Sequence, residues 1–300
     1  MVISRIYGGM GNQMFQYAFG RAIAEKLNTE LQLDIRMLES YATRPNITTR
    51  VFDLDLYNIS AKLSNDDIIK TLPIYSTRSD RYKRIVKNIL GIKTFYNNFE
   101  LITQSRFNPK NISIGNNYLL EGYWQKYEYF KDIEKIIRAE FKLKDKPSDK
   151  IIEIENYIEG RNAVAIQIRK TDYLSITSNR IMFAELKQDY FEAAYNLIKS
   201  KVEKPLFLIF SDDNEWARQN LQFIKDEMLI IEEEWKGDKF QYSTYLMNKC
   251  KNHIISNSSF GWWGAFLADN PEQIVIAPQK WYNIPHKNLN ISTPPAWIRI

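Results

Sequence analysis

The first part of the chain alternates between apolar runs of strand length and one segment of helical period. Residues 2–7 are largely apolar and predict a strand, which the glycines of residues 8–11 end. Apolar side chains then recur every three or four positions from Met14 to Leu27, a spacing that predicts an amphipathic helix. Residues 30–35 predict a second strand. A strand, a helix and a strand in this order predict two parallel strands joined by a right-handed crossover.

The second half of the chain repeats this alternation more regularly. Short apolar runs are followed by segments in which apolar residues return with a helical period. The predicted strands cover residues 163–169, 206–210, 253–256 and 274–277, and the predicted helices cover residues 190–202, 215–223, 242–251 and 260–268. Strands that alternate with helices in this way are typical of a doubly wound α/β domain.

The segment between the two patterns is harder to interpret. Residues 36–120 have no clear period and predict loops and short helices. The best candidate for a boundary is the polar stretch 142–150, which contains a proline. We therefore expect two Rossmann-like α/β domains that face a cleft, one over residues 1–145 and the other over residues 146–300.

Composition and charge narrow the class of protein. The 300 residues are 44% hydrophobic and 26% charged, as in an ordinary folded protein. The net charge of +5 is spread along the chain, which predicts no nucleic-acid partner but fits a phosphate-bearing ligand. A single cysteine, Cys250, excludes an internal disulfide and, with only two histidines, argues against a zinc site. We find no apolar stretch long enough to span a bilayer and no signal-peptide pattern. We expect a cytoplasmic protein, and a peripheral contact with the inner face of the cell membrane stays open.

Three predicted strand ends carry polar clusters, and in open α/β sheets ligands bind beyond the carboxyl ends of strands. The first cluster runs from Gln167 to Asp172. Arg169 would project at the strand end, where its planar fork of donors could grip a pyrophosphate. The alternative is a surface arginine paired with Asp172.

The other two clusters have equally balanced interpretations. Asp212 and Asp213 follow a strand and could cap the next helix or accept hydrogens from a guanine edge; a metal held by this pair would lack a further ligand. The third cluster places hydroxyls and free backbone N–H groups at a helix start, which is either a phosphate site or a simple cap. Its residues are Asn257, Ser258, Ser259 and Phe260, followed by Trp262 and Trp263.

The glycine turn near the N-terminus supports a different enzyme class. Gly9 and Gly11, with Asp34 at the end of the next predicted strand, approximate a dinucleotide-binding fingerprint. Met14 stands where the third glycine is needed, which counts against a nicotinamide- or flavin-dependent oxidoreductase. A second alternative is a non-catalytic glycan-binding module that uses the abundant tyrosines and tryptophans, but it leaves the three polar clusters without a role.

Several long motifs resemble one known family. They are Gly8-Gly9-Met10-Gly11-Asn12-Gln13-Met14-Phe15-Gln16-Tyr17-Ala18, Glu121-Gly122-Tyr123-Trp124-Gln125, Phe210-Ser211-Asp212-Asp213-x-x-Trp216, Ile255-Ser256-Asn257-Ser258-Ser259-Phe260-Gly261-Trp262-Trp263-Gly264-Ala265 and Ala277-Pro278-Gln279-Lys280-Trp281-Tyr282. In this order, and over nearly the whole chain, the sequence resembles the bacterial α-1,2-fucosyltransferases of glycosyltransferase family 11. Two departures stand out. Gln167 replaces the histidine that opens the family's His-x-Arg-Arg-x-Asp hallmark, and Gly261 stands where serine is common.

The resemblance implies a GT-B fold, transfer with inversion, and GDP-fucose as the donor. It implies that Arg169 binds the pyrophosphate, that Asp212 or Asp213 recognises guanine or ribose, and that Asn12 and Gln13 close the cleft. The remaining donor-binding residues that it implies are Gln167, Asn257, Ser258, Ser259 and Phe260. No metal and no other cofactor are expected. Gln167 cannot titrate near neutral pH, so Asp172 is our candidate for the general base. Its alternative role is to orient Arg169, and a mechanism without a strong base is a third option.

The resemblance also implies the acceptor. Family members add fucose to the 2-hydroxyl of galactose, so we expect a galactose-containing oligosaccharide or a lipid-linked glycan, such as an O-antigen or other surface-polysaccharide repeat. Under this interpretation the first domain binds the acceptor and the second binds GDP-fucose.

Overall fold

The computed structural model describes residues 1–300 except 42–49, 75–85, 88–89, 91, 172–180 and 284–290. The chain divides into two compact units, Met1–Glu140 and Phe141–Ile300. The sequence-based boundary, between residues 145 and 146, was placed slightly further along the chain. Each unit contains its own sheet, and each is taken by itself below.

The first unit is built on a six-stranded sheet in the order β3-β2-β1-β6-β5-β4. The strands are β1 (Val2–Arg5), β2 (Leu31–Asp34), β3 (Lys62–Leu63), β4 (Phe95–Tyr96), β5 (Phe99–Thr103) and β6 (Asn117–Glu121). All neighbours are parallel except the β4–β5 pair. The predicted strand–helix–strand unit is β1, α1 and β2, with the two strands parallel and in direct contact.

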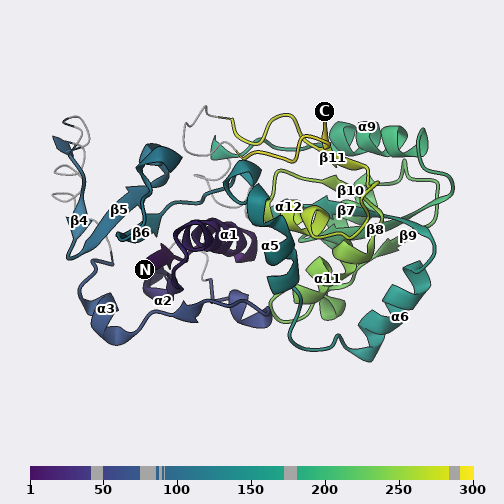
Figure 1. Ribbon diagram of the computed structural model, residues 1–300. Helices are drawn as coiled ribbons and strands as arrows, with labels where there is room; N and C mark the ends of the chain where they lie inside the picture. Colours follow the sequence, from purple (N-terminus) through teal and green to yellow (C-terminus); the bar gives the residue numbers. More distant parts are fainter. Residues whose placement is uncertain (42–49, 75–85, 88–89, 91, 172–180, 284–290) are drawn as a thin grey trace. The chain divides into compact units, whose positions relative to one another are not determined.

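Helices and short 3₁₀ turns lie between these strands and follow β6 (Figure 1). The α-helices are α1 (Met10–Leu27), α2 (Arg36–Tyr41), α3 (Asp66–Lys70) and α5 (Glu134–Glu140), and the 3₁₀ segments are Leu54–Leu56, Gln104–Arg106, Pro109–Asn111, Tyr127–Tyr129 and Lys131–Ile133. The first half of α1 is buried on every side, so it differs from the amphipathic helix expected from sequence. Its polar residues Gln13 and Gln16 are buried and bind backbone groups instead of solvent.

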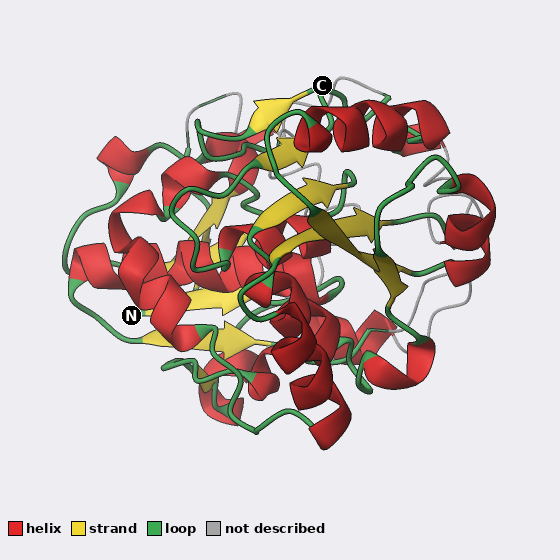
Figure 2. Ribbon diagram, turned by 90° about the vertical axis from the view of Figure 1, so that its right-hand side faces the viewer, coloured by secondary structure: helices red, strands yellow, loops and turns green. Residues whose placement is uncertain are grey.

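The second unit holds a six-stranded, all-parallel sheet in the order β12-β11-β10-β7-β8-β9. The strands are β7 (Asn162–Ile168), β8 (Pro205–Ser211), β9 (Met228–Ile230), β10 (Asn252–Ile255), β11 (Val275–Ala277) and β12 (Ile298–Arg299). The helices are α6 (Asp149–Ile158), α9 (Gln188–Lys199), α10 (Asn214–Asn220), α11 (Gln241–Lys249) and α12 (Ser259–Phe266), with a 3₁₀ turn at Glu233–Trp235. Helices, red in Figure 2, flank the strands, as a doubly wound domain requires.

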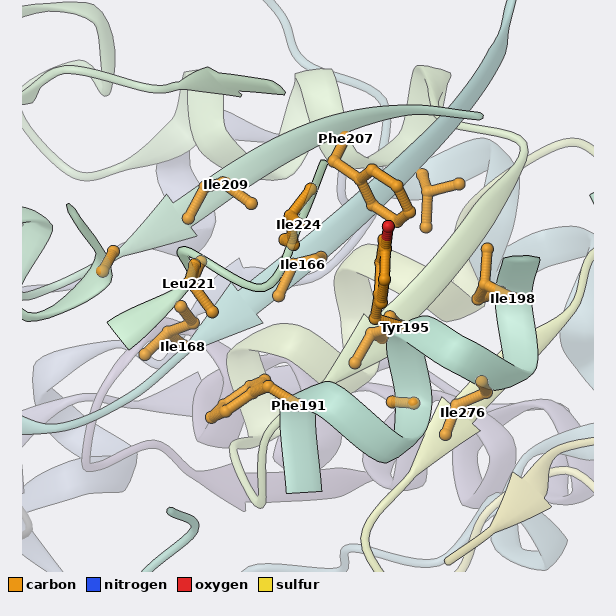
Figure 3. Close-up of a cluster of buried hydrophobic side chains, with 14 residues drawn as sticks. Ile166, Ile168, Phe191, Tyr195, Ile198, Phe207, Ile209, Leu221, Ile224 and Ile276 are labelled. Carbon is orange, nitrogen blue, oxygen red and sulfur yellow. The ribbon is translucent and has the colours of Figure 1, made fainter. Parts of the chain in front are cut away.

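Two apolar cores cover the two faces of this sheet. Val164, Ile166 and Ile168 of β7 pack with Phe191 of α9 on one face (Figure 3). Ala163 and Ala165 belong to the core on the other face, together with α6 and α11. This alternation is the period-2 pattern predicted for the strand. Gln167 is two residues beyond Ala165, so its side chain lies on the same side of the sheet as α11. No helix in the described part of the chain is long and apolar enough to cross a membrane.

Candidate functional site

The three polar clusters of the second unit lie beyond the ends of three adjacent strands. β7 is the neighbour of both β10 and β8, and all three strands are parallel. Ile255 pairs with Gln167, and Ile168 pairs with Ser211, so the strands end level with one another. The residues that follow them therefore gather at one edge of the sheet, as the sequence predicted from their positions at strand ends.

Arg169 is held in place by Asp212. Its guanidinium Nη1 lies 3.3 Å from Asp212 Oδ2, and about a quarter of the arginine side chain is exposed. The same carboxylate accepts hydrogen bonds from the backbone N–H groups of Lys170 (2.8 Å) and Thr171 (3.1 Å) and from the Thr171 hydroxyl (2.5 Å). Asp212 thus fixes the turn that presents Arg169. Asp172, predicted as the base or as the partner of Arg169, lies outside the described residues.

Lys170 points into the protein interior. Its Nζ donates a hydrogen bond to the Leu186 carbonyl oxygen at 2.6 Å and lies 4.2 Å from the centre of the Trp216 ring. Burial lowers the pKa of this amine. Because Lys170 is committed to the interior, Arg169 is the cation of this pair that reaches the strand edge.

Asp213 caps α10. Its Oδ1 accepts a hydrogen bond from the Trp216 backbone N–H at 2.8 Å, and its own backbone is bound by the Ser211 hydroxyl. Capping was one of the two roles that the sequence left open for this residue.

The third cluster opens α12. Ser258 is the N-cap residue, but its hydroxyl makes no capping hydrogen bond. The first helical bond is donated by Trp262 N–H to the Ser258 carbonyl oxygen. The backbone N–H groups of Phe260 and Gly261, two residues and one residue before Trp262, have no acceptor within the helix. A helix start of this kind, with a serine hydroxyl beside it, suits an anion.

Two other predicted residues brace this helix start from inside. Asn257 is buried, and its Nδ2 donates hydrogen bonds to the carbonyl oxygens of Ala184 (2.8 Å) and Trp281 (2.9 Å). Gln167 is buried as well, and its Oε1 accepts a hydrogen bond of 2.6 Å from the Ser256 hydroxyl. Both side chains bind the protein, so their role here is to position the segment that carries Ser258 and Ser259.

Asn12 and Gln13, predicted to close the cleft, lie at the start of α1 in the first unit. Gln13 is buried; its Nε2 donates to the Gly8 and Val51 carbonyl oxygens, and its Oε1 accepts from the Asp53 N–H. Asn12 Oδ1 accepts a hydrogen bond from Gln125 at 2.8 Å.

Asp34, the acidic residue that a dinucleotide site would need, is already paired with arginines of the same unit. Asp34 is buried and accepts a two-pronged pair of hydrogen bonds from Arg36, at 2.9 and 2.8 Å. Its carboxylate also lies 3.7 Å from the Arg5 Nε. A carboxylate bound in this way is not placed to hold a ribose, so the oxidoreductase interpretation loses its acidic residue.

Two positioning residues were absent from the predicted site. Ser256 precedes Asn257 in the motif Ile255–Ala265, so the sequence contained a signal for it. Lys236 lies in no sequence motif that indicated a site. Its buried Nζ donates a hydrogen bond to the Ser211 carbonyl oxygen at 2.7 Å. This contact depends on the path of the chain after β9. Among the described residues, no three His, Cys, Asp or Glu side chains cluster as a metal site would require.

Comparisons with known proteins point to one family. The model of glycosyl transferase family 11 matches residues 1–300. An α-1,2-colitosyltransferase of Escherichia coli is 30% identical, over 100% of this chain and 99% of that protein. The O-antigen biosynthesis glycosyltransferase WbnK of Escherichia coli is 28% identical, over 99% of each chain. A galactoside α-(1,2)-fucosyltransferase 1 of Saimiri boliviensis boliviensis is 25% identical over 50% of this chain and 42% of that protein.

Solved structures show the same fold. The NodZ α-1,6-fucosyltransferase of Bradyrhizobium superposes with a TM-score of 0.53 at 13% identity, covering 92% of this chain and 94% of that one. At this identity the likeness concerns the fold, which is the GT-B class of two Rossmann-like domains expected from the sequence. The family model, by contrast, covers every residue of the chain. The chain is a glycosyltransferase and belongs to glycosyl transferase family 11.

Proposed function

We propose that this enzyme transfers L-fucose from GDP-fucose to the 2-hydroxyl of a galactose in an acceptor glycan, with inversion at the fucose carbon. One observation carries the proposal: Arg169 and the start of α12 follow two adjacent parallel strands and together offer a pyrophosphate a guanidinium and the backbone N–H groups of Phe260 and Gly261. The family match and the relatives named as α-1,2-transferases support the choice of reaction.

The chemistry of the leaving group fits these residues. GDP departs as an anion, so donors aimed at its β-phosphate stabilise the transition state more than the ground state. Arg169 supplies the charge, and Ser258, Ser259 and the Phe260 N–H supply neutral donors. Removal of one such donor typically lowers the rate by about 100- to 1000-fold. No metal is needed in this scheme, because the protein supplies the positive charge.

The nucleoside is assigned to the end of β8. All of the protein contacts of Asp212 hold the turn of Arg169, so Asp212 acts on the donor through that arginine. Asp213 uses Oδ1 as a helix cap. We assign its second carboxylate oxygen, Oδ2, to guanine or ribose.

The proton of the acceptor hydroxyl must be removed during transfer. Asp172 follows Thr171, whose hydroxyl is bound to Asp212, and it is our candidate for the general base. A transition state with much oxocarbenium character acidifies the acceptor hydroxyl late, and then no strong base is required. Asp172→Asn separates the two schemes, because only the first predicts loss of the acidic limb of the pH–rate profile.

A second donor is favoured by one specific observation. The relative that is 30% identical over the whole chain is named for transfer of colitose. Colitose is fucose without its 3-hydroxyl, so the two donors place the same demands on Arg169 and α12. GDP-colitose is therefore the second candidate donor.

We propose that the first unit binds the acceptor and that the acceptor is a galactose-containing, lipid-linked surface-glycan repeat. The relative named for O-antigen biosynthesis supports this choice. A cytoplasmic enzyme in peripheral contact with the inner membrane face would meet such an acceptor.

The deciding experiment measures GDP release in the presence of EDTA, with GDP-fucose or GDP-colitose, a panel of β-galactosides, and controls without acceptor. Acceptor-dependent release from GDP-fucose would establish the reaction and exclude an obligatory metal. Faster release from GDP-colitose would move the proposal to that donor, and loss of activity with EDTA that magnesium restores would end the metal-free scheme. Arg169→Ala should abolish release, whereas Arg161→Ala, a surface arginine of the same unit paired with Glu227, should not.

A further inference from the structure

Gln167 fills the space beneath the first turn of α12. Its side chain is 4% exposed, and its Oε1 accepts the Ser256 hydroxyl at 2.6 Å. The backbone of the same two residues is also joined, since Ser256 N–H donates to the Gln167 carbonyl oxygen at 3.1 Å. This double link joins the end of β7 to the segment after β10 just before the two segments reach the candidate site.

Gly261 makes this arrangement sterically feasible. A Cβ atom added at position 261 would lie 2.4 Å from Gln167 Oε1 and 2.9 Å from Gln167 Cδ. Real Cβ atoms essentially never approach other heavy atoms this closely. The contact is therefore available only to glycine, and it brings the first turn of α12 directly onto the Gln167 carboxamide. The reason for glycine here is space, because its backbone is ordinary helix.

We propose that Gln167, Ser256 and Gly261 form a spacer that sets the separation between the two halves of the pyrophosphate site. Arg169 follows Gln167 by two residues, and Ser258 follows Ser256 by two residues. The carboxamide between them fixes how far the guanidinium stands from the N–H groups of α12. Gln167 is thus a positioning residue that acts through Ser256 and α12 and does not touch the donor.

The spacer has a functional consequence because a pyrophosphate must be gripped from both sides at once. A displacement of about 1 Å between positioned groups can lower a rate by about 100-fold. A methyl group at position 261 has to move either the carboxamide or the helix. The nucleoside, assigned to β8, lies on the other side of β7 and should not sense this movement. This inference rests on the pyrophosphate site of the proposed function.

The test compares binding of GDP and of guanosine, which lacks the phosphates, to the folded enzyme by calorimetry. We expect Gly261→Ala to weaken GDP binding by about tenfold or more while guanosine binding changes by less than about twofold. In the Gln167→Ala background the oxygen that clashes is gone, so Gly261→Ala should have little further effect. Gly264→Ala is the matched control: it lies one turn later in α12, and its Cβ would meet the flexible Met247 side chain at 2.7 Å. It should leave the ratio of the two affinities unchanged.

Three results would overturn the spacer. They are an equal loss of GDP and guanosine binding in Gly261→Ala, the same effect of Gly261→Ala with and without Gln167, and a matching loss of GDP binding in Gly264→Ala. Failure of the proposed function looks different, because the unmodified enzyme would then bind no GDP at all.

Discussion

Asp212 pairs with Arg169 and also holds the turn that presents it, which makes Asp212 a sensitive residue of the site. The Asp212 oxygens hold the Lys170 and Thr171 backbone as well as the guanidinium. Asparagine keeps the shape of this side chain but has one acceptor oxygen in place of two, so the arginine loses its counter-charge and one backbone N–H of the turn loses its acceptor.

We expect Asp212→Asn to lower kcat by about 10- to 100-fold, since a charge-assisted contact contributes about 1.5–3 kcal/mol. Steady-state rates at varied GDP-fucose measure this, with Glu227→Gln as control, because Glu227 pairs with the surface Arg161 of the same unit. Unchanged kcat in Asp212→Asn would mean that Arg169 is positioned by other contacts.

At this scale the sequence predicted where site residues stand better than what each one binds. Asp34 was a plausible ribose ligand from its position at a strand end, yet Arg36, two residues later, takes both of its oxygens. A polar residue after a strand can cap a helix, form an ion pair or bind a ligand, and its position in the sequence does not distinguish these roles. The choice depends on neighbours such as Leu186 or Trp281, which are brought close only by the tertiary structure.

The turn from β10 into α12 is the element on which the site depends most. Asn257 ties it to the segments that contain Ala184 and Trp281, and Gln167 supports it from β7. Regular alternation predicted this strand and helix within one or two residues, since β10 spans Asn252–Ile255 and α12 spans Ser259–Phe266. Residues 36–120 gave no such signal because their strands are short and are stabilised by pairing with strands distant in sequence, as β6 is by β1.

Asn257→Ala tests the turn as an element. It removes two buried hydrogen bonds and leaves two carbonyl oxygens without that donor, which should destabilise the protein by about 2–3 kcal/mol. Urea denaturation followed by tryptophan fluorescence measures the change in unfolding free energy. Asn98→Ala, at an exposed position in the first unit, is the control and should change it by less than about 0.5 kcal/mol. If Asn257→Ala lowers the free energy of unfolding by no more than the control does, the turn is held mainly by the packing of α12.

At the scale of the whole molecule, the interior of the second unit carries a titratable group in an otherwise apolar setting. His253 lies in the central part of the sheet, fully buried, with its Nε2 2.9 Å from the Met247 carbonyl oxygen. Burial lowers its pKa from 6.5 to about 4, so the folded protein holds the neutral ring, with the proton on Nε2 facing that carbonyl.

This burial makes stability depend on pH in a predictable direction. Between about pH 4 and 6.5 the unfolded chain binds a proton at His253 and the folded chain does not, so the free energy of unfolding rises with pH across this window. Acidification from pH 7 to pH 5 should therefore remove about 2 kcal/mol through this residue. His253→Gln keeps a donor for the Met247 carbonyl but cannot titrate, and its unfolding free energy should fall less over the same range. Parallel urea titrations at pH 5, 6 and 7 give the difference directly, because all other titrating groups are common to both proteins. Identical pH dependence in the two proteins would mean that the imidazole has the same pKa in the folded and the unfolded chain, whereas a ring that stays protonated in the fold would make the unfolding free energy of the unmodified protein fall relative to that of His253→Gln as the pH rises through 6.5.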